Sequence, residues 1–121
     1  MTEPQLHHLP CPDSAGVQRM ARRMAYWQWG ASDAQAVVLC VHGLTRQGRD
    51  FDVLARSLLD AAPARSLRVI CPDVAGRGRS DWLADPSLYQ PMSYLADMQA
   101  LLVHLHAQAP MVTLDWAVSY T

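Results

Sequence analysis

A short apolar run that ends in a histidine and a glycine, "AVVLCVHG" over residues 36–43, most constrains the fold. Six residues rich in valine fit a strand that is buried on both faces. The pattern returns in "LRVICPDVAG", where a largely apolar segment is followed by Pro72 and Gly76, which prevent the strand from continuing. We therefore expect two buried strands, Ala36–Val41 and Leu67–Cys71, each leading into a loop.

Helical periodicity follows each of these strands. The first set of apolar positions is Phe51, Val53, Leu54, Ala55, Leu58 and Leu59, with Asp50 or Asp52 as the N-cap and Pro63 at the end. The second set is Tyr94, Leu95, Met98, Leu101, Leu102 and Leu105, which form the buried face of an amphipathic helix. Another strand begins after Pro110. The order strand, helix, strand, helix, strand predicts a parallel sheet covered by helices, an α/β fold.

The N-terminal part of the chain is less regular. Arg22–Trp29 alternates imperfectly and precedes turn residues, which predicts a short strand at a sheet edge. We expect residues 1–21 to be a poorly ordered extension and residues 22–121 to form one partial domain, because 121 residues suffice for at most one domain.

Composition excludes several classes of protein. Half of the residues are hydrophobic and the net charge is −1, which argues against a disordered chain or a nucleic-acid partner. Apolar stretches fall short of the ~20 residues that span a bilayer, and the N-terminus lacks the features of a signal peptide. We expect a cytoplasmic protein without a membrane partner. The cysteines, Cys11, Cys40 and Cys71, are expected to be free and to serve in packing.

The His42-Gly43 pair follows the carboxyl end of a predicted strand, which is where parallel sheets usually bind their ligands. Glycine has no Cβ, so the backbone can approach a bound group closely. The amide of Leu44 is then placed to donate a hydrogen bond to a negatively charged oxygen, while His42 supports the turn from beneath.

Three segments together resemble the N-terminal part of the α/β-hydrolase family, in its esterase, lipase and C–C hydrolase branch. They are "VVLCVHGLTRQGRDFDVLARSL", "RVICPDVAGRGRSDW" and "VTLDW", and the resemblance extends from about Tyr26 to Trp116. It implies an incomplete mostly parallel sheet, and hydrolysis of an ester-like small molecule by a Ser-His-Asp triad without metal or cofactor.

The resemblance also implies roles for individual residues. The Leu44 N–H is one of two oxyanion-hole donors, and the loss of such a donor costs about 3 kcal/mol of transition-state stabilisation. The second loop, with Asp73, Gly76, Gly78 and Ser80, supports the site. Asp73 is expected to accept a hydrogen bond from His42 or from loop amides.

Ser119 stands at the spacing of the nucleophile in "AVSYT", but Thr121 replaces the second glycine of the G-x-S-x-G turn. The family places its acid and its catalytic histidine later in the chain, and His104 and His106 are not convincing bases. We therefore interpret Ser119 as a strand residue or part of a frame-altered tail. The expectation is a truncated or frameshifted gene product that is inactive alone.

Two alternatives come from other classes of protein. Gly43 and Gly48 have the spacing of a nucleotide-binding P-loop, but Arg49-Asp50 replaces the required Lys-Ser/Thr, and an aspartate there repels phosphate. A metal site is not expected, since Cys40 and His42 lack a third ligand. The other alternative is a non-catalytic fragment whose last strand is an exposed, aggregation-prone edge.

Overall fold

The computed structural model describes residues 3–11, 22–43, 46–83, 87 and 89–118. Its elements, in chain order, are β1 (Gln5–Cys11), β2 (Arg22–Gly30), β3 (Ala36–Val41), the 3-10 helix η1 (Gly48–Phe51), α1 (Asp52–Ala61), β4 (Leu67–Pro72), α2 (Pro91–Gln108) and β5 (Thr113–Val118). The strands form one sheet in the order β1-β2-β4-β3-β5.

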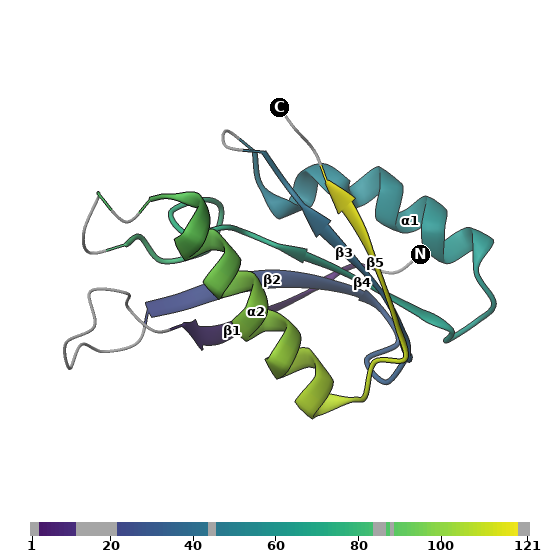
Figure 1. Ribbon diagram of the computed structural model, residues 1–121. Coiled ribbons are helices and arrows are strands. Elements are labelled where there is room, and N and C mark those ends of the chain that lie inside the picture. Colours follow the sequence, from purple (N-terminus) through teal and green to yellow (C-terminus); the bar gives the residue numbers. More distant parts are fainter. Residues whose placement is uncertain (1–2, 12–21, 44–45, 84–86, 88, 119–121) are drawn as a thin grey trace.

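The three strands predicted to be parallel are parallel. Strand β3 lies between β4 and β5 and pairs with both in the same direction, so that Ala36 is opposite Leu67 on one side and Thr113 on the other. Helices α1 and α2 cover opposite faces of the sheet (Figure 1). The predicted α/β fold is thereby confirmed, and the carboxyl ends of β3 and β4 meet at one edge.

Alternation along the strands divides the core between the two faces. Towards α2 the buried residues are Leu9, Cys11, Met24, Tyr26, Val37, Leu39, Ile70, Val74, Met98, Leu101 and Leu105. Towards α1 they are Trp29, Cys40, Ala55, Val69 and Cys71. The three cysteines are free and buried, as expected. A hydrogen bond with Cys40, together with burial, raises the pKa of the Cys71 thiol, which keeps it protonated and unreactive.

The N-terminal part differs from the sequence-based expectation. Residues 5–11 were expected to be poorly ordered, yet they form β1 and pair antiparallel with β2 from Gln5–Gln28 to Cys11–Arg22. Their alternation places Leu9 and Cys11 in the core, which stabilises the strand. Strand β2 is consequently an interior strand, antiparallel to β1 and β4, and the predicted edge position was wrong. Residues 12–21 lie outside the described part of the chain.

The first helix begins differently from the predicted start, because neither Asp50 nor Asp52 is its N-cap. Asp50 accepts a hydrogen bond from the Gln47 amide (3.3 Å) at the start of η1, and it does not cap α1. Asp52 is the first residue of α1 and forms a 2.6 Å ion pair with Arg49. Helix α2 begins at Pro91, where a proline costs no hydrogen bond because the first amides of a helix have no partner inside it. In the described part of the chain, no helix is sufficiently long and apolar to cross a membrane.

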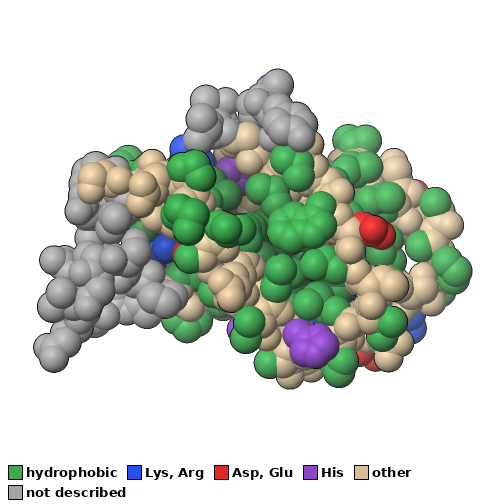
Figure 2. All heavy atoms as spheres, in the orientation of Figure 1, with side chains coloured by type: hydrophobic (Ala, Val, Ile, Leu, Met, Phe, Trp, Pro, Cys, Tyr) green, Lys and Arg blue, Asp and Glu red, His purple; other side chains and the backbone are tan. Residues whose placement is uncertain are grey.

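Strand β5 is the end strand on the side away from β1. Trp116 and Val118 are each 50% exposed, and they lie on the face that carries α2. Figure 2 shows hydrophobic side chains gathered over this face. The end strand therefore leaves an apolar surface exposed to solvent, whereas a complete hydrophobic core would be covered.

Candidate functional site

His42 leaves the end of β3 and turns back into the protein, where it is 5% exposed. Its Nε2 accepts a hydrogen bond from the Val74 amide (3.0 Å), so this nitrogen carries no proton. Its Nδ1 therefore carries the proton of the neutral ring and donates it to the Gly43 carbonyl oxygen (2.7 Å). Burial lowers the pKa of His42, which favours the same neutral form. The ring links the β3 turn to the loop after β4.

The Gly43 carbonyl oxygen has a second donor. The Arg46 amide donates to it across 3.1 Å. Two hydrogen bonds therefore fix the direction of this carbonyl. Leu44, the expected oxyanion-hole donor, lies outside the described residues, and its role stays a prediction.

Asp73 joins the two loops at this edge. Its carboxylate, 1% exposed, accepts hydrogen bonds from the Gly48 amide (2.7 Å, Oδ1) and from the Arg79 amide (2.9 Å, Oδ2). Of the two alternatives that the sequence left open, the structure selects the loop amides. The Gly48 amide is at the start of η1, so one buried carboxylate fixes both the entry to the first helix and the loop after β4.

Two glycines make room for this carboxylate. Gly78 has a φ of +51°, and a Cβ added there would collide with the Asp73 carboxylate. At Gly48 an added Cβ would stand 2.5 Å from the Cys71 carbonyl oxygen and 3.0 Å from Asp73 Oδ1. Gly78 was expected to be part of the supporting loop, whereas no structural role was expected for Gly48. A side chain at Gly48 would prevent this segment from approaching the end of β4 and Asp73 so closely.

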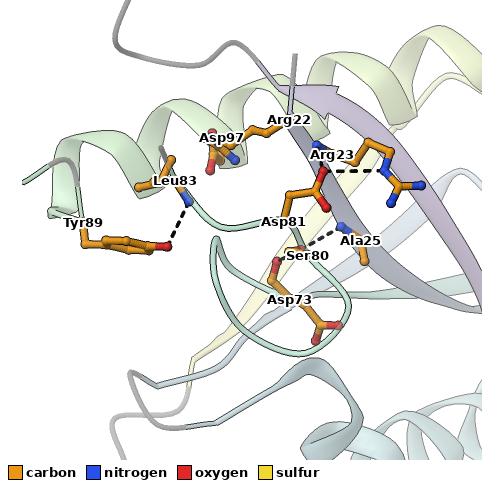
Figure 3. Close-up of polar contacts among 9 residues, drawn as sticks. All are labelled: Arg22, Arg23, Ala25, Asp73, Ser80, Asp81, Leu83, Tyr89 and Asp97. Atoms are coloured by element: carbon orange, nitrogen blue, oxygen red, sulfur yellow. Dashed lines mark hydrogen bonds and ion pairs between the residues drawn. The ribbon is translucent and has the colours of Figure 1, made fainter. Parts of the chain in front are cut away.

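The loop over residues 73–81, here called the support loop, is also bonded to β2 (Figure 3). Ser80 Oγ accepts from the Ala25 amide (2.8 Å) and donates to the Asp73 carbonyl oxygen. Asp81 Oδ2 accepts from the Arg23 amide (2.8 Å), while the Asp81 amide donates to the Arg23 carbonyl (2.9 Å). The Ser80 hydroxyl therefore satisfies both the buried amide of Ala25 and the carbonyl oxygen of Asp73.

A buried ion pair, which sequence reasoning missed, stands beside the support loop. Arg22 of β2 and Asp97 of α2 approach to 2.6 Å, with side chains 6% and 4% exposed (Figure 3). The residues are 75 positions apart, so only the tertiary structure could reveal the pair. It connects the antiparallel part of the sheet to the helix that covers it.

Arg77 projects from the support loop among aromatic rings. Its guanidinium carbon lies 5.8 Å from the centroid of the Tyr89 ring and 5.7 Å from that of Tyr94. It also donates to the Tyr94 hydroxyl (3.1 Å) and to the Ala75 carbonyl (2.9 Å). Stacking and hydrogen bonding hold the planar guanidinium in one orientation.

Two hollows open near these groups. An apolar hollow of about 670 Å³ lies between the start of α2 and the ends of β3 and β5, lined by Val41, Tyr89, Gln90, Pro91, Tyr94, Leu95, Met98, Trp116 and Val118. A polar hollow of about 400 Å³ lies between the two loops and is lined by Arg46, Gln47, Asp50, Arg77 and Gly78. A large apolar pocket beside a few polar groups is the usual form of a small-molecule site.

The remaining predictions concern the nucleophile, a metal site and a nucleotide-binding loop. Ser119 and Thr121 lie outside the described residues, so the interpretation of Ser119 stays a prediction. Among the residues that the structure describes, no cluster of three or more His, Cys, Asp or Glu side chains has the arrangement of a metal site. Arg49, in the position of the P-loop lysine, donates two 2.8 Å hydrogen bonds to Asp52. A nucleotide-binding loop is therefore not favoured.

No family model matches the sequence. Among curated proteins, the chain is 43% identical over 113 residues to a 3-hydroxybutyrate-oligomer hydrolase of Cupriavidus necator, an alignment that covers 93% of this chain and 34% of that protein. It is 35% identical over 86 residues to an epoxide hydrolase of Caballeronia sordidicola, covering 70% of this chain and 25% of the relative. The chain therefore spans between a quarter and about a third of these relatives.

A solved structure gives the same result. The α/β hydrolase of Novosphingobium aromaticivorans superimposes with a TM-score of 0.69 at 38% identity, over 86% of this chain and 32% of that one. The solved hydrolase therefore shares the fold of this chain over the matched part. The chains of the relatives extend well beyond that part.

Proposed function

The chain belongs to the α/β-hydrolase family, of whose fold it carries the N-terminal part, and from this premise we propose that it supplies one side of an active site that hydrolyses esters or related bonds. The contribution of this part is a backbone hydrogen-bond donor, the Leu44 N–H, for the oxyanion of the tetrahedral intermediate. The second donor, the nucleophile, the acid and the catalytic histidine belong to the later part of the fold.

The fixed carbonyl of Gly43 carries this proposal. In a trans peptide the N–H of the next residue points opposite to the carbonyl. The His42 Nδ1 and the Arg46 amide both donate to the Gly43 oxygen, so they hold this carbonyl in one direction. We propose that this arrangement orients the Leu44 N–H before substrate binds, which is the condition for electrostatic catalysis without reorganisation.

The bond to be cleaved is proposed to be a carboxylic ester. The relative with 43% identity is a 3-hydroxybutyrate-oligomer hydrolase, and such oligomers are linked by ester bonds. The apolar hollow beside the β3 turn suits the short aliphatic part of an ester of this type. A cytoplasmic location and the absence of a nucleic-acid partner stay predictions from composition.

A hybrid enzyme tests this proposal. The matched 113 residues of the Cupriavidus necator hydrolase are replaced by those of this chain, and release of 3-hydroxybutyrate from its linear trimer is followed. We expect the hybrid to hydrolyse the trimer and Leu44→Pro, which removes the N–H, to lower kcat on the order of 100-fold. Leu44→Ala keeps the N–H and serves as the matched control.

The readouts separate a lost donor from a lost fold. Circular dichroism of each variant is measured first, and only variants that melt like the parent hybrid are compared. Equal kcat for folded Leu44→Pro and Leu44→Ala hybrids contradicts the oxyanion role. A folded hybrid that does not hydrolyse the trimer contradicts the proposed ester hydrolysis.

A further inference from the structure

The polar hollow has the composition of an anion site. Its walls come from two loops, residues 46–50 after β3 and residues 77–78 after β4. Arg46 and Arg77 supply two positive charges, and Asp50 supplies one negative charge. The net charge of the lining is therefore +1, which matches a monoanion.

The hollow is held open by contacts outside it. The Asp73 carboxylate accepts one hydrogen bond from each wall, from the Gly48 amide (2.7 Å) and from the Arg79 amide (2.9 Å). A single buried group thus fixes the spacing of the two loops. A site whose walls are already in place loses little conformational entropy when a ligand binds.

The arginines differ in how they are held. Arg77 is oriented by the rings of Tyr89 and Tyr94 and by its bond to the Tyr94 hydroxyl. The Arg46 side chain is exposed and makes no hydrogen bond or ion pair with any residue that the structure describes. Its backbone amide is bonded to the oxygen of Gly43, the residue before the proposed oxyanion donor.

We propose that the polar hollow binds the free carboxylate of an acidic ester substrate, with Arg46 as the main ligand. The inference rests on the proposed ester hydrolysis and adds the substrate class, an ester whose chain ends in a carboxylate. A guanidinium pairs with a carboxylate through two parallel hydrogen bonds. A phosphate dianion fits less well, because Asp50 repels its second charge.

Titration of the chain itself tests the site. Backbone amide resonances are followed by NMR while 3-hydroxybutyrate, its methyl ester or inorganic phosphate is added. We expect 3-hydroxybutyrate to shift the amides of residues 46–50 and 77–78, and its methyl ester to leave them in place. We expect Arg46→Gln to weaken binding about ten-fold. We expect Arg65→Gln, which changes a 73% exposed arginine in the turn before β4, to bind as the parent does.

Several results would contradict the proposed carboxylate binding in the polar hollow. They are equal shifts from the acid and its methyl ester, no shift from the acid, unchanged affinity in Arg46→Gln, or tighter binding of phosphate than of the carboxylate. The two proposals also fail separately. A hybrid that does not hydrolyse the trimer contradicts ester hydrolysis, whereas the titration decides carboxylate binding without any turnover.

Discussion

The support loop and strand β5 both contribute to the carboxyl edge of the sheet, but they are stabilised in different ways. In the support loop the polar groups of Asp73 and Ser80 are buried and bonded to Gly48, Arg79 and Ala25. In β5, Trp116 leaves half of its side chain exposed on an apolar face.

This difference teaches which part of the site the chain completes by itself. Hydrogen bonds in the support loop have both partners within the described residues, so the geometry of the loop is determined internally. The apolar surface of β5 contributes to stability only when another group covers it and removes its apolar area from water. Stability of the loop is therefore expected to depend on single polar groups, and that of β5 is expected to be nearly insensitive to its exposed side chains.

The substitution Asp73→Ala is expected to have the largest effect and tests the comparison most directly. The amides of Gly48, which is buried, and Arg79 then lose their acceptor, and each hydrogen bond to a charged group contributes about 1.5–3 kcal/mol. We expect the free energy of unfolding to fall by about 3 kcal/mol or more in urea denaturation. Asp60→Ala, an exposed aspartate on α1, is the control and is expected to change it by less than about 0.5 kcal/mol. Equal effects of both substitutions contradict the role of Asp73.

A smaller effect is expected from pH through His42. Its folded-state pKa lies below the ordinary value of 6.5, so the unfolded chain binds more protons below that pH, and stability falls as pH falls. The slope from this residue cannot exceed about 1.4 kcal/mol per pH unit. We expect the free energy of unfolding, measured from pH 7.5 to 5.5, to decline more steeply in the parent than in His42→Gln. Parallel profiles would show that the ring is not held neutral.

The smallest effect on stability is expected from Trp116→Thr on β5. Threonine keeps the preference for a strand, and the exposed tryptophan contributes little to the core, so the free energy of unfolding should change by less than about 0.5 kcal/mol. Self-association, measured by sedimentation velocity, should decrease because the apolar surface is smaller. Leu101→Thr, a buried position on α2, is the contrasting variant and should be strongly destabilised. A parent chain that is monomeric at all concentrations contradicts the exposed-surface argument.

Much of the candidate site was predictable because it lies where strands end. Gly43 follows one buried strand and Asp73 another, and the carboxyl ends of neighbouring parallel strands meet at the same edge. The joint role of the two loops was expected from the family resemblance, and their proximity at one edge of the sheet agrees with this rule. The polar hollow was not predictable, since Arg46 and Arg77 are 31 residues apart and neither belongs to a periodic pattern.

The amino-acid sequence by itself determined β3, α1, β4, α2 and β5, because short valine-rich runs and helical periodicity are properties of neighbouring residues. Only the tertiary structure decided that Gln5–Cys11 is a strand, that β2 lies inside the sheet and that Arg22 pairs with Asp97. These features depend on which distant segments come together. Their free energy comes from pairing and burial across the fold, and no local pattern records it.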